Sequence, residues 1–487
     1  MSVTTPNWVK DAIFYQIFPD RFARSAFVDK PHHIETWDSP PTMHGFKGGD
    51  LIGIIEHLDH LVELGINAIY FCPIFQSTAN HRYHTHDYFQ VDPILGGNDA
   101  FRKLLDAAHA RNIRVVIDGV FNHASRGFYY FNHTLENGKE SPYLDWFTFT
   151  KFPLHAYEDG QQGYAAWWNL KALPKLNTFN PQVREYIMRV GEYWIAQGAD
   201  GWRLDVPGEI DDDSFWQEFR ARVKALNPAA YIVGEIWHRA DRWLQGDQFD
   251  AVMNYQFTRA ALSYCVGLKH AAKELLQGSS YGDVTTADAE QFADLLEQVQ
   301  TWYDPEITYA QMNLLDSHDT ARFLSIAKGD KTALKLAWLA MFTYPGAPTI
   351  YYGDEIGMEG GLDPDCRRGM VWEKSKWDND LFETAKKYIA LRKKYHVLRR
   401  PGGYARLHAQ DQIYVFARQL EGETLIVALN AGEQLAELDL NVGAILLEGT
   451  HVLEEWSDET RVIESGILRH IEIPARDGVV WSAHSPH

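Results

Sequence analysis

Three acidic residues stand where carboxylates can perform acid–base and covalent chemistry. Asp205 lies in GWRLDV, Glu235 in YIVGEIW and Asp319 in NLLDSHDT. The first two end apolar, strand-like runs, and the third closes a turn after another such run. A carboxylate at the end of a buried strand is costly unless it is paired or used there. Because Arg203 precedes Asp205 by two positions and His318 adjoins Asp319, the pattern predicts one acidic cleft.

The elements that must position these residues alternate along the first 395 residues. The clearest helix is 181–197, which has Asn180 as its N-cap, Pro181 in its first turn and Gly198 just past its end. Most of the other helix-period segments likewise lie between apolar strand-like runs. Eight such units predict an α/β fold, a (β/α)8 TIM barrel. The predicted strands are 12–17, 67–71, 113–118, 200–205, 230–235, 249–253, 310–315 and 347–352.

Two segments fall outside this alternation. Residues 124–178 are far longer than a crossover needs and predict a loop domain inserted after strand three, which tends to be functional. After about residue 396, short alternating runs predict a C-terminal antiparallel β domain. We therefore expect a barrel in two parts, a small inserted domain and a β-sandwich. Their predicted bounds are 1–123 and 179–396 for the barrel, 124–178 for the insert and 397–487 for the sandwich.

The composition limits the partners of this chain. A net charge of −20 over 487 residues argues against nucleic acid and anionic membranes. We see no export signal at the N-terminus and no apolar run long enough to span a membrane. The three cysteines form no CxxC pair and no disulfide framework. We therefore expect a cytoplasmic protein whose ligand is neutral or cationic.

The barrel prediction brings the acidic residues together. Active sites of such barrels lie at the C-terminal ends of the strands. Asp118, Arg203, Asp205, Glu235 and the 316–319 turn all fall at predicted strand ends, on strands three, four, five and seven. Each alone could be a buried carboxylate paired with an arginine. Their shared place on one rim favours catalysis.

At this point the chain resembles the α-amylase family, glycoside hydrolase family 13. The segments DGVFNH (118–123), GWRLDV (201–206), GEIW (234–237) and LDSHD (315–319) resemble its four main motifs, in order. Within that family, four further segments resemble the cyclomaltodextrinase, neopullulanase and maltogenic amylase subgroup. These are 46–75, 172–177, 246–255 and 351–372.

The resemblance implies a role for each catalytic acid. Asp205 would be the nucleophile that forms a covalent glycosyl-enzyme. Glu235 would protonate the leaving oxygen and then activate water, for which burial and nearby negative charge should raise its pKa. Asp319 would hold the sugar 2- and 3-hydroxyls in the transition state. Two displacements would retain the α configuration.

Further residues match substrate-binding positions of the family. Arg203 would keep Asp205 ionised, and Tyr83 would stack under the ring whose hydroxyls His123 and His318 bind. Asp363 and Arg367 would hold the next sugar on the non-reducing side. Glu209 and Trp237 match the leaving-group side, although Trp237 could equally be core packing. The predicted substrate-binding set is Tyr83, Asp118, Asn122, His123, Arg203, Glu209, Trp237, His318, Asp363 and Arg367.

No metal or cofactor is predicted to be required. Many relatives bind calcium through a loop after the DRF segment, but here 20–30 lacks most of the oxygen ligands, and only Gly49 and Asp50 match. We predict that this site is absent or weak. HRYHTHDY (81–88) carries histidines at metal-binding spacing, yet His84 and His86 more simply form a polar wall beside Tyr83.

The leading prediction is a retaining hydrolase of α-1,4 bonds in maltooligosaccharides, cyclodextrins, pullulan or starch, with transglycosylation as a side activity. The alternatives are a dedicated glucan transferase or isomerase, a non-catalytic glucan-binding protein, and a metal-dependent barrel enzyme that uses the histidines. Typical subgroup members carry an N-terminal β domain that forms a swapped dimer, and this sequence begins at the first barrel strand. We accordingly expect a monomer or a dimer of another kind.

Overall fold

The computed structural model describes residues 3–484. Eight parallel strands form a closed barrel in the order β1-β10-β9-β8-β7-β6-β5-β2. Each predicted barrel strand coincides with one of them, which confirms the predicted (β/α)8 fold. Most are entirely buried because both of their faces are covered, as their continuous apolar sequences indicate. The strands are β1 (Phe14–Ile17), β2 (Ala68–Phe71), β5 (Arg114–Gly119), β6 (Gly201–Leu204), β7 (Tyr231–Gly234), β8 (Ala251–Asn254), β9 (Met312–Asn313) and β10 (Ala347–Tyr351).

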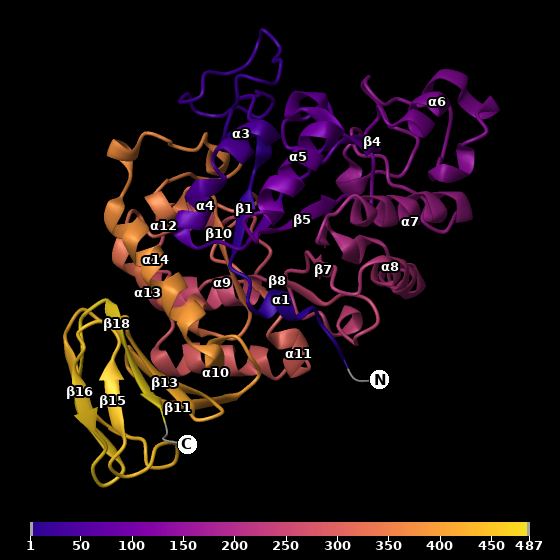
Figure 1. Ribbon diagram of the computed structural model, residues 1–487. Coiled ribbons are helices and arrows are strands. Elements are labelled where there is room, and N and C mark those ends of the chain that lie inside the picture. The colour runs from indigo at the N-terminus through magenta and orange to yellow at the C-terminus, as the bar shows by residue number, and fades with distance from the viewer. Residues whose placement is uncertain (1–2, 485–487) are drawn as a thin grey trace.

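Helices surround the barrel (Figure 1). The predicted helix after the insert is α7, whose N-cap Asn180 accepts a hydrogen bond from the Gln182 amide and whose buried stripe includes Val183 and Trp194. The longer helices are α3 (Leu51–Glu56), α4 (Leu58–Leu64), α5 (Gly97–His109), α7 (Pro181–Ala196), α8 (Asp213–Leu226), α9 (Tyr255–Ala261), α10 (Ala289–Gln300), α13 (Lys331–Thr343) and α14 (Asn379–Lys394). Single turns are α1 (Asn7–Lys10), α2 (Pro19–Phe22), α11 (Pro305–Thr308) and α12 (Phe323–Ile326).

The long connection between β5 and β6 has little regular structure besides α7. Before α7 it holds helix α6 (Tyr129–Asn137) and the 3-10 turns η2 (Gly138–Glu140), η3 (Leu144–Trp146) and η4 (Trp167–Asn169). Isolated bridges join Phe147 to Leu176 and Phe149 to Tyr164. Aromatic packing holds this segment together; Phe131, for example, contacts Phe147. A β-hairpin of β3 (Phe75–Ser77) and β4 (Thr85–Val91) follows β2.

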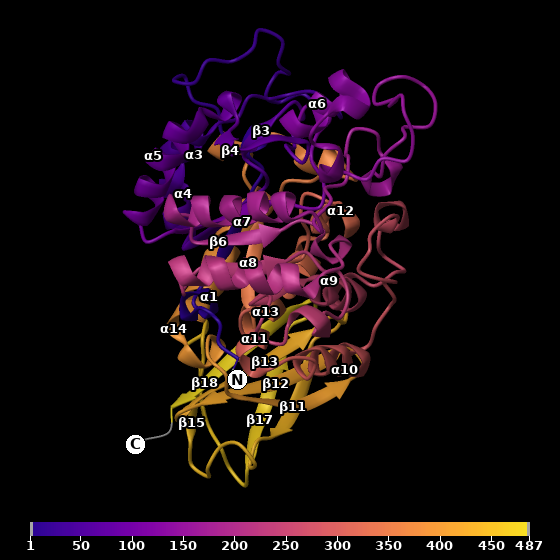
Figure 2. The same ribbon diagram turned by 90° about the vertical axis from the view of Figure 1, so that its right-hand side faces the viewer.

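The C-terminal strands form two antiparallel sheets, of order β11-β12-β13-β18-β15-β16 and β14-β17. They lie at the bottom of both ribbon views, on the far side from α6 (Figures 1 and 2). The buried Arg418 ties them to the barrel by donating to the Thr343 and Val397 carbonyls. The strands are β11 (Gly403–Gln410), β12 (Ile413–Leu420), β13 (Glu423–Asn430), β14 (Ala436–Asn441), β15 (His451–Glu454), β16 (Thr460–Val462), β17 (Ile467–Ile473) and β18 (Asp477–His484).

The antiparallel C-terminal architecture agrees with the sequence prediction, although β11, β15 and β16 were not predicted. The domain boundaries drawn from the sequence stay predictions. Across residues 3–484, no helix is both long and apolar enough to cross a membrane.

Candidate active site

Arg203, on β6, is the centre of the candidate site. Its side chain is fully buried and contacts three carboxyls. Nη1 lies 2.9 Å from Asp118 Oδ2 and 3.1 Å from Asp205 Oδ1, and Nη2 lies 3.0 Å from Glu235 Oε2. Since β5, β6 and β7 are neighbours in register, the residues at their C-terminal ends meet. One guanidinium therefore holds Asp118, Asp205 and Glu235 together.

Asp319 reaches this cleft from the loop after β9. His318 Nε2 lies 3.1 Å from Asp319 Oδ2 and 2.6 Å from the Tyr83 hydroxyl oxygen. The Tyr83 hydroxyl in turn donates to Asp118 Oδ2 at 3.0 Å. The side chain of Asp319 is 31% exposed, against 9% for Asp205. Asp319 is thus more open to a ligand than Asp205 is.

Arg367, in the loop after β10, extends the same network. Its Nε donates to the His318 carbonyl at 2.8 Å. Nη1 lies 3.0 Å from Asp363 Oδ1 and Nη2 3.4 Å from Asp319 Oδ1. Asp363 and Arg367 therefore lie beside Asp319, at the strand β9 and β10 side of the barrel.

Burial and crowding raise the pKa values of the acids around Arg203. Burial raises the pKa of Asp118 to about 6, with the Arg203 charge opposing the shift. Burial likewise raises the pKa of Asp205 and of Glu235, and the Asp319 charge adds to both shifts. One guanidinium cannot neutralise three buried carboxylates, so the cluster favours keeping a proton near neutral pH.

The backbone after Asp205 adopts a conformation that is rare for a β-branched residue. Val206 has φ 35° and ψ 50°, in the left-handed region. Its amide donates to Glu235 Oε2 at 3.1 Å. The strained turn thus directs a donor at the carboxyl beside Asp205, and strain of this kind concentrates at functional sites.

Trp237 serves both packing and the site. Its ring stacks on Tyr255 at 3.5 Å between centroids, and its Nε1 donates to Glu235 Oε1 at 3.1 Å. Glu209 lies outside the acidic network; its Oε2 is 3.3 Å from Lys175 Nζ. Lys175 also pairs through its backbone with His123.

Asn122 and His123 lie just after β5, at the start of the long connection to β6. Asn122 Nδ2 lies 3.2 Å from His123 Nδ1. Asn122 Oδ1 and His123 Nε2 are buried and have no hydrogen-bond partner within residues 3–484. Burial lowers the pKa of His123 to about 3, so the ring is neutral.

Sequence reasoning missed two residues that support the site. Tyr70, on β2, donates to Asp118 Oδ2 at 2.9 Å, and Gln16 Nε2, on β1, lies 2.8 Å from His318 Nδ1. Both are polar side chains near the C-terminal ends of buried, otherwise apolar strands. That signal was present in YQIF and AIYF.

Of the histidines in 81–88, His81 lies beside the Tyr83 ring and His84 lies beside His81. The His81 ring is 4.9 Å from that of His84 and 5.8 Å from that of Tyr83. Burial lowers the pKa of His84 to about 4 and shifts those of His81 and His86 downward. Within the described part of the chain, no group of three His, Cys, Asp or Glu is arranged to hold a metal ion.

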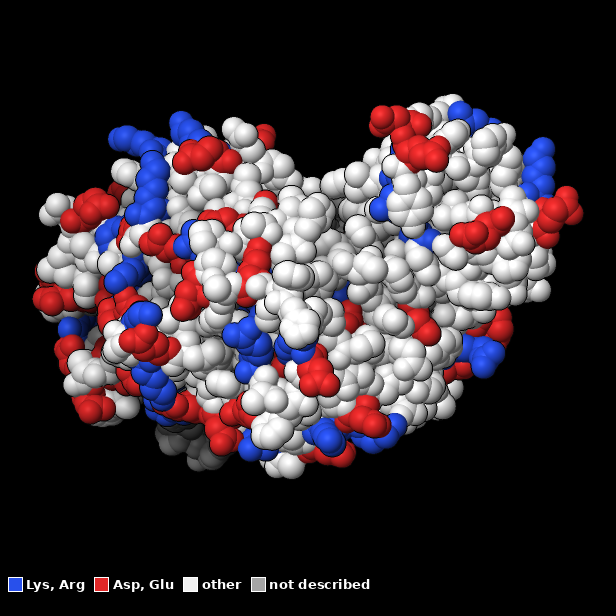
Figure 3. All heavy atoms as spheres, turned by 90° about the horizontal axis from the view of Figure 1, so that it is seen from above, with Lys and Arg blue, Asp and Glu red and all other residues white. Residues whose placement is uncertain are grey.

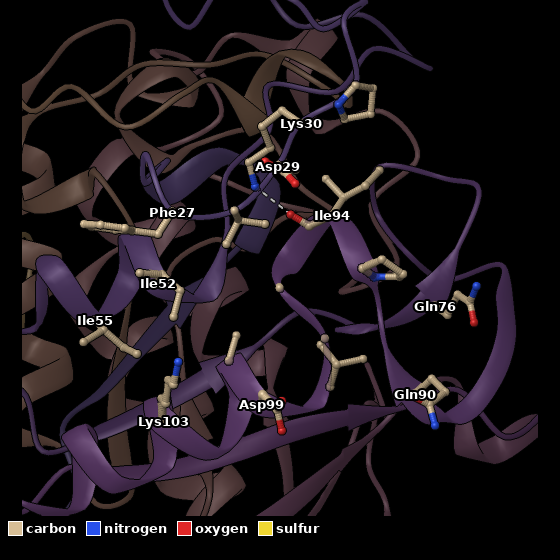
Figure 4. Close-up of a pocket in the computed structure, with 17 residues that line it drawn as sticks. Phe27, Asp29, Lys30, Ile52, Ile55, Gln76, Gln90, Ile94, Asp99 and Lys103 are labelled. Atoms are coloured by element: carbon tan, nitrogen blue, oxygen red, sulfur yellow. Dashed lines mark hydrogen bonds between the residues drawn. The ribbon is translucent and has the colours of Figure 1, made fainter.

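Gly49 and Asp50, the two residues that match a calcium-binding loop in the sequence, lie in a segment that contains an ion pair. Asp50 is fully buried, and its Oδ2 lies 3.0 Å from Lys30 Nζ and accepts from the Ser25 amide at 2.9 Å. Lys30 Nζ also donates to the Ile94 carbonyl at 2.6 Å (Figure 4). Calcium takes six to eight oxygen ligands. Here the ammonium group of Lys30 lies beside Asp50 Oδ2.

Gly49 has a packing role in the same segment. A Cβ there would lie 2.2 Å from the Pro19 carbonyl oxygen, so the close approach of the two backbones requires glycine. A groove of about 1060 Å³ adjoins Lys30, between residues 27–31, α3 and α5. None of the predicted site residues lines it.

The surface seen from above is hollowed between the main body and a lobe on the right, where Figure 1 places α6 (Figure 3). Acidic and basic side chains are interspersed around this hollow.

Comparisons with known proteins agree with this geometry. The alpha amylase catalytic domain profile matches residues 16–421, and the neopullulanase-like C-terminal domain profile matches 404–482. A cyclomaltodextrinase from a Bacillus species is 47% identical, covering 87% of this chain and 73% of that protein. Neopullulanase 2 from Thermoactinomyces vulgaris is 44% identical, covering 88% and 70%. The crystal structure of a Nostoc punctiforme debranching enzyme is 49% identical, covers both chains fully and superposes with a TM-score of 0.90.

Proposed function

The chain belongs to the α-amylase family of glycoside hydrolases, and we propose that it hydrolyses α-glucans with retention of configuration. The observation that carries the proposal is the cluster of Asp205 and Glu235 on the two Nη atoms of Arg203. A retaining mechanism requires a nucleophilic and a protonating carboxyl that are close together. Asp319, more exposed and beside both, completes the set.

In the first step, the Asp205 carboxylate attacks the anomeric carbon while Glu235 protonates the departing glycosidic oxygen. Arg203, 3.1 Å from Asp205 Oδ1, stabilises the anion that attacks. In the second step, the Glu235 carboxylate takes a proton from water, which displaces Asp205. The raised pKa of Glu235 suits the first task, because the acid must hold its proton at neutral pH.

Asp319 binds sugar hydroxyls in this proposal, with His318 and Arg367 holding its two carboxylate oxygens. Such hydrogen bonds strengthen as charge develops on the ring and thus favour the transition state. Asp363 and Arg367 lie on the same side and would contact the next sugar of the non-reducing end.

A panel of substrates tests the function. We expect the protein to cleave γ-cyclodextrin, maltotriose, pullulan or soluble starch, and to release the α anomer first by proton NMR. At high maltotriose, longer oligosaccharides should form, because a sugar can replace water in the second step. An α-1,6-branched dextrin belongs in the panel, since one related structure is named a debranching enzyme. Release of β anomers would contradict the mechanism, and transfer that always exceeds hydrolysis would identify a transferase.

We propose further that no calcium is needed, because Lys30 replaces it. Treatment with EDTA should leave both the rate and the melting temperature unchanged. Lys30→Met should destabilise the protein by about 3 kcal/mol, since the buried Asp50 carboxylate loses its counter-charge. Lys103→Met is the matched control, because Lys103 lines the same groove but is exposed. Thermal unfolding with and without calcium measures both effects. A melting temperature that drops with EDTA and recovers with calcium would contradict the proposal.

The predicted cytoplasmic location and the predicted monomer or unswapped dimer stay predictions.

A further inference from the structure

Two tryptophans of the insert form a stack that begins at His123. The His123 and Trp167 rings are nearly parallel, 5.3 Å apart and inclined by 16°. Trp167 and Trp168 continue the stack at 4.5 Å and 13°. Trp168 is 74% exposed, so its ring stands at the surface. The three rings therefore form one stack, with the neutral His123 at its buried end and the exposed Trp168 indole at its surface end.

The backbone is strained where it presents these rings. Trp168 has φ 48° and ψ 28°, and Asn169 has φ 56°. Non-glycine residues seldom adopt this left-handed region, and a bulky aromatic residue does so least readily. Because the Trp168 indole is largely exposed, its burial contributes little free energy to offset this backbone strain. Backbone strain of this kind concentrates at active sites and ligand-binding positions.

Hydrogen bonds fix the stack to the barrel. The Trp167 amide donates to the Leu173 carbonyl at 3.0 Å, and a bridge pairs Ala166 with Pro174. The Pro174 carbonyl then accepts from the Ala124 amide at 3.0 Å, and the next residue, Lys175, pairs with His123. These backbone contacts therefore fix the position of the rings relative to the residues that follow β5.

The same short segment reaches the strand that carries Asp205. Lys175 Nζ donates to the Glu209 carbonyl at 2.9 Å, in the turn η5 (Pro207–Glu209) after β6. The segment that carries the stack therefore contacts the loops after β5 and β6, and β6 pairs with β7, which leads to Glu235. Asp363 and Arg367 lie on the opposite side, with β9 and β10. In the proposed mechanism Glu235 protonates the departing oxygen, so the departing sugars would lie on the side of the barrel where β7 ends.

We propose that Trp168, supported from behind by Trp167, forms a platform for glucose rings on the leaving-group side of the cleaved bond. This inference rests on the proposed function and adds a specificity-determining element to it. The apolar faces of α-glucosyl rings would stack on the exposed indole of Trp168. The platform would therefore favour glucans that extend beyond the cut bond, and would hold the acceptor sugar during transglycosylation.

The experiment compares two substrates that share the same donor part. Trp168→Asn removes the ring while keeping a residue that tolerates the left-handed backbone. We expect kcat/KM for maltotetraose to fall about tenfold, the loss of one aromatic contact. For α-maltosyl fluoride, the leaving group is a single atom that cannot reach the Trp168 ring. We therefore expect kcat/KM for this substrate to fall by less than about twofold. With glucose as acceptor, the ratio of transfer product to hydrolysis product should fall together with the rate on maltotetraose.

Matched variants separate the platform from general damage. Trp168→Phe keeps a ring and should restore most of the maltotetraose rate. Phe27→Ala removes an equally exposed aromatic ring from the distant groove of Figure 4 and should change neither rate. An equal loss on both substrates, or none on maltotetraose, would overturn the platform. Failure of the unsubstituted protein to hydrolyse α-maltosyl fluoride would instead refute the proposed function.

Discussion

Asp205→Asn is expected to abolish glucan hydrolysis, with kcat falling by more than about 10⁴-fold, the range found when a covalent nucleophile is removed. Asparagine keeps the shape of the side chain but cannot form the glycosyl ester. Arg203 still contacts Asp118 and Glu235, so the surrounding geometry should persist. Initial rates on maltotriose and γ-cyclodextrin measure the loss. Retention of more than a few per cent of the activity would refute the nucleophile assignment.

The same variant should fold at least as stably as the natural chain. Burial, together with the Glu235 and Asp118 charges, holds the folded-state pKa of Asp205 above its ordinary value. A raised carboxyl pKa means that the folded state binds the proton more tightly than the unfolded state. Stability is then lost as pH rises through the folded pKa. A neutral amide removes this cost, so the melting temperature at pH 7 should be unchanged or higher. A clearly lower melting temperature of the variant would contradict this expectation and indicate that the Asp205 carboxylate stabilises the fold.

Azide gives an independent test of the nucleophile. Asp205→Ala opens space on the face of the sugar from which the carboxylate attacks. With α-maltosyl fluoride, azide entering from that face should yield the β-maltosyl azide. Formation of the α product alone would contradict the assigned geometry. Asp212→Ala is the control, because its carboxylate caps α8 and contacts Arg184, away from the cluster.

The barrel and its acidic rim were predictable because their signals are local. Most barrel strands lie in short, largely apolar runs, and α7 begins and ends at residues with clear capping preferences. The C-terminal edge strands were harder. β11 is half-exposed along most of its length, and β16 has three residues, so neither shows a strong alternation.

The pairings that hold the site together were not predictable, because they join distant segments, although the polar residues near the strand ends were visible in the sequence. Tyr70 reaches Asp118 across 48 positions, and Gln16 reaches His318 across 302. The left-handed Val206 has no sequence signal at all, since a valine predicts extended backbone. The ammonium of Lys30 beside Asp50 likewise depends on the fold of an irregular loop. The sequence therefore predicted which acids converge, and the structure adds the contacts that orient them.

Glu235→Gln is expected to slow glucan hydrolysis by about 10³-fold, within the range that general acid–base catalysis contributes. Glutamine can keep the contact with the Val206 amide through its carbonyl oxygen, but it has no proton to give to the departing sugar. The loss should depend on the leaving group. For α-maltosyl fluoride the departing fluoride needs no protonation, so the first step should persist and the glycosyl-enzyme should accumulate.

Added azide should then release the α-maltosyl azide, because an anionic nucleophile does not need the base that glutamine cannot supply. This product has the opposite configuration to that expected from Asp205→Ala. The pH dependence gives a second measurement. In the natural protein, the rate should fall as pH rises through the raised pKa of Glu235, as the acid loses its proton. This alkaline decline applies to glucans; for α-maltosyl fluoride, whose leaving group needs no proton, neither the natural protein nor the variant should show it. Asp319→Asn is the comparison: it should slow both substrates, since Asp319 acts on the sugar that glucans and the fluoride share.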